Sequence, residues 1–335
     1  MILVTGATGL LGSNLLFELS KSEESLRALY RSEHKIAFVK KLFIRLDALH
    51  GEERFSKIEW LKGDVLDLIS LDDAISGVSH VYHCAAMVSF RRRDFHQLIQ
   101  VNRKGTANVV NVCLEKGIQK LCYVSSTAAV GKVKINGHFE VRETNKWVQT
   151  PDLNGYSNSK HMAENEVWRG MEEGLNAVII NPSVLFGPGD WNESSLTIFR
   201  TVANGLHFYT NGSNAFVDVR DVVETMIFLM NEPVSSERFL CTGTNVSFKD
   251  LLTYIAQAMN KKPPGFFANP FLSALAWRLV AIAELFGKKP TLTKESVHSS
   301  QQNVLYHSDK LLALTKKDFR PLHETICYTI ENQVK

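Results

Sequence analysis

The sequence has few cysteines, and none of them is arranged as a disulfide framework or a metal site. The five cysteines show no paired spacing, no C-x-x-C motif and no histidine cluster at ligand spacing. Cys84 and Cys122 lie in apolar, strand-like runs, where cysteine acts as a small core residue. This use of cysteine is typical of a reducing compartment, so we expect a cytoplasmic protein without a bound metal.

Long hydrophobic runs and a large excess of charge are also missing. The net charge is only +3 and is spread over the chain, so nothing indicates nucleic-acid binding. The longest apolar stretch, residues 265–287, contains an arginine and a glutamate and favours an amphipathic helix over a membrane span. We expect no signal peptide either, because the first apolar strand begins at the first or second residue.

What the sequence does contain is an alternation of apolar, strand-like runs with helical patterns. This alternation predicts an α/β fold, a Rossmann-type doubly wound parallel sheet buried between helices on both faces. With 335 residues and 44% hydrophobic side chains, the chain can form this domain and a smaller partner. The strand-like runs are Ile2–Thr5, Leu26–Tyr30, Ile58–Leu61, His80–Cys84, Leu121–Ser125 and Ala177–Asn181.

The regular alternation ends after Pro182, and a Gly-Pro-Gly sequence at 187–189 breaks the chain. Beyond it, short helical patterns mix with loops and one strand-like run, Arg238–Cys241. We expect a smaller, mostly helical C-terminal lobe over the carboxyl edge of the sheet, where open α/β sheets bind ligands. The expected boundaries are 1–182 with a return contribution from about 214–243 for the sheet domain, and 183–213 with 244–335 for the substrate-binding lobe.

The first twelve residues, MILVTGATGLLG, place Gly6, Gly9 and Gly12 between an apolar run and a helical pattern. Glycine at these positions allows a tight turn, close approach of the backbone to a pyrophosphate, and close packing of helix on strand. The amino end of the helix presents free N–H groups and a positive dipole end. The segment predicts a nicotinamide-dinucleotide site rather than an ordinary glycine-rich turn, with contacts from Gly6, Thr8, Gly9, Leu10, Leu11 and Gly12.

Residues after the second and third strands bear on which dinucleotide is bound. An acidic residue after the second strand binds the ribose hydroxyls of NAD, whereas a cation there pairs with the 2′-phosphate of NADP. Arg31 stands at this point, so we favour NADP(H) over NAD(H); the other interpretation is a surface arginine that caps the strand. After the third strand, Asp64 and Val65 either hold the adenine edge or Asp64 caps a helix over Leu68–Ile75.

Tyr156 and Lys160 are spaced to lie on one face of a helix. An ordinary tyrosine has a pKa near ~10, but a neighbouring ammonium and an oxidised nicotinamide favour the phenolate and lower that pKa. Tyr156 would then exchange a proton with a carbonyl or alcohol oxygen, and Lys160 would also bind the nicotinamide ribose. The fifth strand ends in Ser125-Ser126-Thr127, whose hydroxyls either stabilise charge on that oxygen or only cap the strand end.

An asparagine on an apolar helical stripe also needs an explanation. Asn102 shares the stripe of the helical pattern Asp94–Leu114 with apolar residues. A buried amide needs hydrogen-bond partners. Asn102 must therefore either tie down backbone or face a functional cavity.

Eight motifs occur in this order along the chain: TGATGLLG, GDV, HCAA, VNRKGT, YVSSTAAVG, YSNSK, NPSVLFGPGD and FVDVRDVV. In order and spacing they are similar to those of the extended short-chain dehydrogenase/reductases, and they span nearly the whole chain. The resemblance implies that Ser126 is the catalytic Ser/Thr, Tyr156 the acid/base and Lys160 its partner. It also implies that residues at the ends of two strands lie near the cofactor, namely Ala85, Ala86, Asn181, Pro182 and Ser183. His83 is interpreted as a strand-core residue.

Departures from the sugar-nucleotide branches of this family argue against a dehydratase or an epimerase reaction. The dehydratases place Asp-Glu directly after the catalytic residue, where this chain has Thr127-Ala128. The epimerases usually carry an acidic residue where Arg31 stands, and sugar-nucleotide enzymes tend to carry an arginine where Asn214 stands. The chain most resembles the reductase branch, with dihydroflavonol 4-reductase-like and 3β-hydroxysteroid dehydrogenase-like members.

We therefore expect NADPH-dependent reduction of a ketone or aldehyde on a fairly apolar small molecule. Tyr156 would protonate the oxygen, Ser126 would steady it, and Lys160 would tune Tyr156. A nucleotide-sugar epimerase with bound NAD and a dinucleotide-sensing protein without turnover are the alternatives.

The family often pairs through the helices matching Asp94–Leu114 and Tyr156–Met171, which implies a homodimer. Apolar residues that either cover the substrate or pack in the lobe's own core are Phe266, Phe267, Phe271, Leu272, Leu275, Trp277, Leu279 and Val280.

Overall fold

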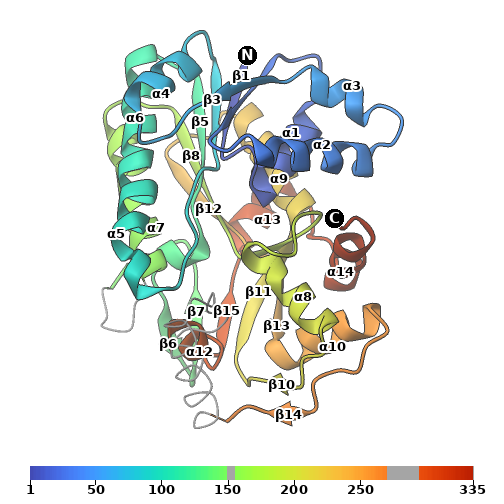
Figure 1. Ribbon diagram of the computed structural model, residues 1–335. Coiled ribbons are helices and arrows are strands. Elements are labelled where there is room, and N and C mark those ends of the chain that lie inside the picture. Colours follow the sequence, from blue (N-terminus) through green and yellow to red (C-terminus); the bar gives the residue numbers. More distant parts are fainter. Residues whose placement is uncertain (149–154, 270–293, 335) are drawn as a thin grey trace.

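A computed structural model describes residues 1–148, 155–269 and 294–334. At its centre lies a seven-stranded sheet with the order β3-β2-β1-β4-β5-β8-β12, in which all neighbours pair in parallel (Figure 1). The strands are β1 (Ile2–Thr5), β2 (Leu26–Tyr30), β3 (Glu59–Lys62), β4 (His80–His83), β5 (Lys120–Val124), β8 (Ala177–Pro182) and β12 (Glu237–Cys241). The predicted α/β doubly wound fold is confirmed. Strand order reverses between β1 and β4, the point at which such sheets bind ligands.

Helices cover both faces of this sheet, because successive strand side chains enter opposite apolar clusters. Ile2 and Val4 pack on one face, while Leu3 packs on the other. Figure 1 shows the two layers on the left and right of the sheet. The first layer contains α1 (Leu10–Leu19), α2 (His34–Leu46) and α9 (Val219–Asn231), and the second contains α4 (Leu68–Ile75), α6 (Gly105–Lys116) and α7 (Gly155–Glu172).

The helical pattern over Asp94–Leu114 does not form one continuous α-helix. A short helix, α5 (Phe95–Leu98), leads into a π-helical segment, Ile99–Lys104, and α6 begins at Gly105. Segments of this kind occur often at functional sites because they re-aim side chains within a helix. Asn102 lies in this segment.

The described part of the C-terminal lobe holds five helices, and beside them small sheets that the sequence did not predict. It contains three small sheets, of which one also takes two strands from the 133–141 region. Their strands are β9 (Val184–Phe186), β11 (Ser213–Asp218) and β13 (Thr244–Ser247); β6 (Val133–Ile135), β7 (His138–Val141) and β15 (Val304–Tyr306); β10 (Phe208–Tyr209) and β14 (Phe266–Phe267). These strands have two to six residues, too short to leave a clear alternating pattern in the sequence. The helices here are α8 (Thr197–Ala203), α10 (Phe248–Ala258), α12 (Lys294–Ser299), α13 (Asp309–Thr315) and α14 (Leu322–Glu331).

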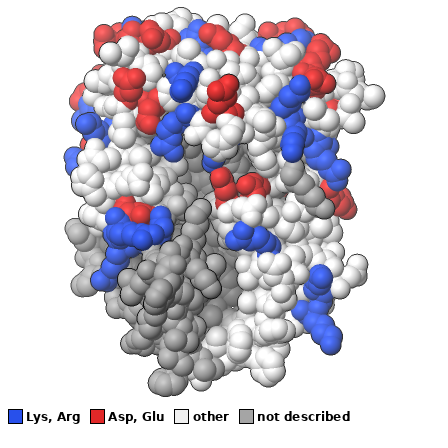
Figure 2. All heavy atoms as spheres, in the orientation of Figure 1, with Lys and Arg blue, Asp and Glu red and all other residues white. Residues whose placement is uncertain are grey.

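The described parts of the chain contain no helix with the length and apolar character of a membrane span. They also gather no group of three or more His, Cys, Asp or Glu side chains that could hold a metal ion. On the face drawn in Figure 2, acidic and basic side chains are interspersed over the upper part of the molecule. Of the apolar residues named above in the lobe, only Phe266 and Phe267 are described, and both are exposed; the remainder lie outside the described residues.

Candidate active site

The turn after β1 is closed by glycines that no other residue could replace without movement of the backbone. Gly6 has a φ of +66°, and a Cβ built on it would lie 2.5 Å from the backbone nitrogen of Ala85. A Cβ on Gly12 would lie 2.2 Å from the carbonyl oxygen of Gly6. Gly9 is exposed, and its nearest such contact is an ordinary 3.4 Å. Gly6 and Gly12 therefore pack the turn, whereas Gly9, next to half-buried Thr8, borders open space.

The amino end of α1 is left open for an anion. Gly9 stands before the helix without a side-chain cap, and the first turn carries no acidic residue. The N–H groups of Leu10, Leu11 and Gly12 thus have no acceptor inside the helix. Together with the glycine turn at the β1–β4 switch point, these residues fit the pyrophosphate of a dinucleotide.

Arg31 and Asp64 lie close together at the carboxyl ends of β2 and β3. The Arg31 guanidinium is 3.8 Å from the Asp64 carboxylate, and two-thirds of the Arg31 side chain is exposed. Asp64 does not cap α4: its carboxylate accepts the N–H of Leu66 at 2.9 Å, and Asp67 is the helix cap. Val65 is buried and contacts the core, so it offers only its backbone to a ligand.

Ser126 lies near enough to Tyr156 for its side chain to act on the Tyr156 hydroxyl. Ser126 follows β5, where its Oγ also accepts the backbone N–H of Ala128 at 3.1 Å. Tyr156, in the first turn of α7, hydrogen-bonds Ser126, but burial prevails and raises the pKa of Tyr156 above its ordinary value. The sequence predicted that a neighbouring ammonium and an oxidised nicotinamide lower the Tyr156 pKa. In the protein without cofactor, burial prevails and acts in the opposite direction. The phenol is protonated at neutral pH.

Lys160 is almost completely buried, with 1% of its surface exposed. Its Nζ donates to the Tyr123 hydroxyl at 2.9 Å and to the Val124 carbonyl at 2.8 Å, rather than to Tyr156. Burial lowers the pKa of Lys160 to about 7, although the Glu164 carboxylate opposes this shift. The ammonium of Lys160 therefore titrates close to physiological pH.

Glu164, one helical turn beyond Lys160, is a buried carboxylate that the sequence reading missed. It accepts hydrogen bonds from Ser125 at 2.6 Å and Asn181 at 2.8 Å, and it forms an ion pair with Arg238 of β12 at 2.9 Å. Asn181 also donates to the Ser126 carbonyl at 2.9 Å. This set, which we call the Glu164 network, fixes the backbone that carries Ser126. Its signal was the continued i, i+4 spacing after Tyr156 and Lys160.

The amide of Asn102 ties the segment after β4 to α7. Its Oδ1 accepts the N–H of Met87 at 2.7 Å, while its Nδ2 donates to the Met87 carbonyl at 2.9 Å and to Ser159 Oγ at 2.8 Å. Of the two explanations for this residue, the structure supports the one in which it ties down backbone. Asn102 thereby fixes the segment after β4 against α7, the helix that carries Tyr156.

The remaining expected cofactor residues lie at the carboxyl ends of β4 and β8. Ala85 is half-buried and Ala86 is exposed. Pro182 and Ser183 are buried, and the Ser183 hydroxyl donates to the Thr242 carbonyl at 2.9 Å, so only the backbone of this segment is available to a ligand. His83 is fully buried at the end of β4, as its strand-core interpretation requires.

Two aromatic residues beside the catalytic set also escaped the sequence reading. The ring of Phe90, a residue that is 41% exposed, meets the Tyr156 ring edge-on at a centroid distance of 5.8 Å. Val88, two residues earlier, is exposed as well. On the other side, the Tyr306 hydroxyl bonds the side chain of Thr127, and burial raises the pKa of Tyr306 to about 12. An apolar surface thus lies next to the reactive hydroxyls.

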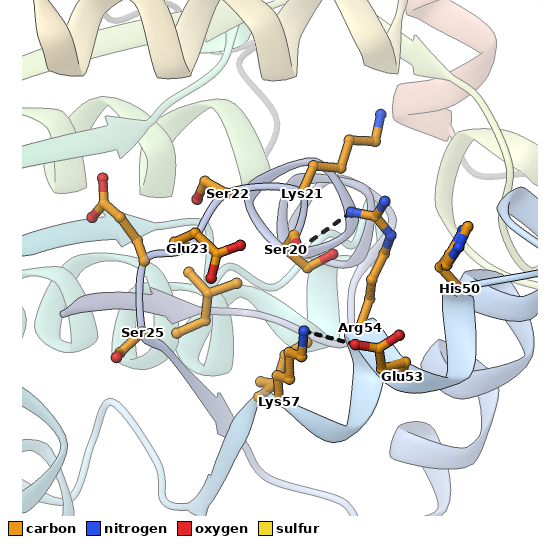
Figure 3. Close-up of a pocket in the computed structure, with 12 residues that line it drawn as sticks. Ser20, Lys21, Ser22, Glu23, Ser25, His50, Glu53, Arg54 and Lys57 are labelled. Atoms are coloured by element: carbon orange, nitrogen blue, oxygen red, sulfur yellow. Dashed lines mark hydrogen bonds and ion pairs between the residues drawn. The ribbon is translucent and has the colours of Figure 1, made fainter.

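A separate groove of about 370 Å³ lies at the amino end of β2, away from this set (Figure 3). It is lined by the end of α1, the start of β2 and α3 (Gly51–Ser56). Three of its charged groups are used within the protein: Lys57 pairs with Glu53 at 2.8 Å, and Arg54 donates to the Ser20 carbonyl (Figure 3). We assign no part of the site to it, because ligands of such sheets bind at the opposite, carboxyl edge.

Comparisons with known proteins agree with this geometry. The sequence profile of the NAD dependent epimerase/dehydratase family matches residues 2–241. The chain is 31% identical over 274 residues to sterol demethylase protein B of Methylococcus capsulatus, covering 81% of this chain and 78% of that one. It is 28% identical to cinnamoyl-CoA reductase 1 of Petunia hybrida, covering 78% of each. The crystal structure of gox2253 superimposes with a TM-score of 0.78 at 27% identity, covering 99% of this chain and 97% of that one.

Proposed function

Because the chain belongs to the NAD dependent epimerase/dehydratase family, we propose that it reduces a ketone or aldehyde on a fairly apolar small molecule with NADP(H). At the coarser level, it is an NAD(P)-dependent oxidoreductase of the extended short-chain dehydrogenase/reductase type. The observation that carries the proposal is the convergence of Ser126, Tyr156 and buried Lys160. Lys160 lies one helical turn after Tyr156, and its Nζ donates to the Val124 carbonyl, two residues before Ser126.

The glycine turn and the amino end of α1 would hold the dinucleotide, which supplies the hydride when bound. Tyr156 holds a proton on its hydroxyl at neutral pH, since burial raises its pKa, and donates that proton to the carbonyl oxygen. Ser126 donates a hydrogen bond to the same oxygen and stabilises its developing charge. Lys160 adds positive charge one helical turn away from Tyr156. These roles favour reduction over oxidation at neutral pH, because the acid is already protonated.

An apolar substrate is supported by the side chains that flank Tyr156. Phe90 exposes apolar surface directly beside the acid, and Val88, two residues earlier, exposes more; covering this surface would exclude water from the reacting oxygen. This chain resembles sterol demethylase protein B, whose name refers to an apolar molecule, and cinnamoyl-CoA reductase 1, whose name refers to an apolar cinnamoyl group on a charged carrier. We place substrate selection in the lobe formed by 183–213 and 244–335, with additional contacts from Phe90.

NADP(H) is proposed as the cofactor because Arg31 is largely exposed at the end of β2. Its separation of 3.8 Å from Asp64 leaves the guanidinium free to turn towards a 2′-phosphate. Asp64 would then face the adenine edge.

We further propose a homodimer that pairs through α5, α6 and α7, which sedimentation at several protein concentrations would test.

The test of the proposed function is NADPH oxidation across a carbonyl panel that includes aromatic, steroidal and small polar substrates. We expect turnover with the bulky apolar carbonyls and little with the small polar ones. Absence of oxidation across the whole panel would contradict the proposal and favour a sensing role. Protein that purifies with unreleased NAD and epimerises a nucleotide sugar would contradict it in favour of an epimerase.

A further inference from the structure

A chain of buried polar side chains runs from Lys160 to the start of the glycine turn. Its members come from α7, β5, α6, β4 and β1, and each is at most 1% exposed. The measured contacts are Lys160 Nζ to Tyr123 OH at 2.9 Å, Thr106 Oγ1 to His83 Nε2 at 3.0 Å, and His83 Nδ1 to Thr5 Oγ1 at 2.7 Å. Between the first two, the Thr106 side chain acts on the Tyr123 hydroxyl and opposes the burial that raises the Tyr123 pKa. We call this set the Lys160 chain. Thr5 immediately precedes Gly6, and its Oγ1 also accepts the N–H of Ala85 at 3.3 Å.

The Lys160 ammonium sets the direction at one end of the Lys160 chain, and the direction of the remaining hydrogen bonds depends on the tautomer of His83. An ammonium only donates, so the Tyr123 oxygen accepts from Lys160 and gives its own proton to Thr106. We infer that Thr106 donates to Nε2 of His83, which assigns the single imidazole proton to Nδ1, facing Thr5 Oγ1. Burial lowers the pKa of His83 to about 3, so this ring is neutral and carries one proton, as the direction requires.

The position of Lys160 also depends on this arrangement. A lysine side chain has a flexible four-carbon stem and three N–H donors. Tyr123 and the Val124 carbonyl take two of them, and the Tyr123 ring lies 4.6 Å from Nζ. The third donor remains for whatever enters the site above Tyr156. Without the Tyr123 hydroxyl, only the Val124 carbonyl of these two acceptors would remain for Nζ.

We propose that Tyr123 is a positioning residue for Lys160, and that the hydrogen-bond chain behind it links the ammonium of Lys160 to the dinucleotide cradle at Thr5 and Ala85. The inference rests on the proposed function only in treating Lys160 as part of the catalytic set. Tyr123 touches neither substrate nor cofactor in this scheme. It acts by holding Lys160 and by setting which nitrogen of His83 carries the proton.

The titratable groups around Lys160 determine what loss of this link would do. They are Tyr123 from β5, His83 and Cys84 from β4 and its end, and Tyr156 and Glu164 from α7. His83 is neutral, and burial raises the pKa of Cys84 to about 12, so Glu164 is the nearby counter-charge. Removing a hydroxyl that accepts from the ammonium disfavours the charged form and lowers the pKa of Lys160.

The decisive variant is Tyr123→Phe, which removes one oxygen and keeps the ring. We expect kcat to fall roughly tenfold, KM for the carbonyl to change less than about twofold, and the high-pH limb of kcat to move to lower pH by about half a unit or more. In the cofactor-free protein, nitrogen NMR should show the His83 proton on Nδ1 in the parent. That fixed state should be lost in the variant.

The matched control is Tyr82→Phe. Tyr82 is also a buried tyrosine, one strand away on β4, but it packs in the cluster on the opposite face of the sheet. We expect no change in the pH limb or in the His83 signal. If Tyr123→Phe does not fold, Thr106→Val breaks the next link while keeping the side-chain shape, and it should release the His83 proton in the same way.

An unchanged pH limb together with an Nδ1-protonated His83 in Tyr123→Phe would overturn the inference. So would a parent protein in which the His83 proton lies on Nε2. The NMR measurement needs no substrate or cofactor. A failure of the carbonyl panel would therefore remove the proposed function without altering this result, and the two failures are distinguishable.

Discussion

Two buried polar networks flank the catalytic residues, and they are built from different chemistry. The Lys160 chain ends in neutral hydroxyl and imidazole groups, and both hydrogen-bond partners of the ammonium are uncharged. The Glu164 network instead pairs a buried carboxylate with Arg238. The neutral surroundings let burial lower the pKa of Lys160 to about 7, whereas the ion pair holds the Ser126 backbone by charge. The Lys160 chain affects the pKa of Lys160, and the Glu164 network fixes the backbone after β5.

The largest effect is expected from breaking the charged network with Glu164→Gln. The amide keeps the shape but leaves Arg238 without its buried counter-charge and turns an N–H group towards other donors. Because the Arg238 side chain is 20% exposed, we expect the low end of the cost of breaking a buried pair, roughly 3 kcal/mol in the free energy of unfolding. Denaturant unfolding measures it, and kcat should fall as Ser126 loses support.

Glu166→Gln is the matched control on the same helix. Glu166 pairs with Arg103 and Arg169 near the surface, so its loss should cost below about 1 kcal/mol. Equal destabilisation by the two variants would show that the burial of Glu164 carries no special weight.

Titration of Lys160, the charged end of the Lys160 chain, should appear in the pH dependence of the unfolding free energy. The pKa of Lys160 is about 7 in the folded protein and ~10.4 when unfolded, so the unfolded chain binds the extra proton between these values. Unfolding free energy should therefore rise with pH from about 7 towards 10, by roughly 1 kcal/mol per pH unit from this group. Lys160→Met should lose that rise.

The measurement is the difference in unfolding free energy between the parent and Lys160→Met at pH 7, 8 and 9, without cofactor. Subtraction removes the other titrating groups, which both proteins share. A difference that stays constant over this range would mean that Lys160 does not titrate as its burial requires.

A smaller effect is expected at the exposed edge of the cradle, where no network supports the side chain. Arg31→Asp should weaken NADPH binding roughly tenfold, about 1.4 kcal/mol, and should leave NADH binding nearly unchanged. Titration of both cofactors by fluorescence measures this. An unaltered preference for NADPH in the variant would refute the assignment of Arg31 to the 2′-phosphate.

The features that sequence reasoning predicted are those with local spacing. The glycine turn, the strands of the large sheet and the shared helix of Tyr156 and Lys160 each lie within one short segment. The Lys160 chain was out of reach because its five members come from five elements and meet only after folding. His83 was rightly taken for a core residue, but its hydrogen bonds could not be foreseen.

One alternative for Asp64, the helix cap, was wrong because a neighbouring residue competes for that role, and the Tyr156 pKa was wrong because burial decides it. Asp64 and Asp67 both stand near the start of α4, and the helix begins at Leu68, which makes Asp67 the cap. The Tyr156 pKa is another such case, since spacing indicated a charge effect but burial governs the protein alone. The small sheets of the C-terminal lobe were missed because short strands carry little pattern.

The most direct test of the central claim is Tyr156→Phe, measured as NADPH-dependent carbonyl turnover beside NADPH affinity. Removing the proton donor should lower turnover by roughly 10²–10⁴-fold while the dissociation constant for NADPH changes less than about twofold. Tyr82→Phe should leave both unchanged. Turnover in Tyr156→Phe equal to that of the parent would contradict the mechanism.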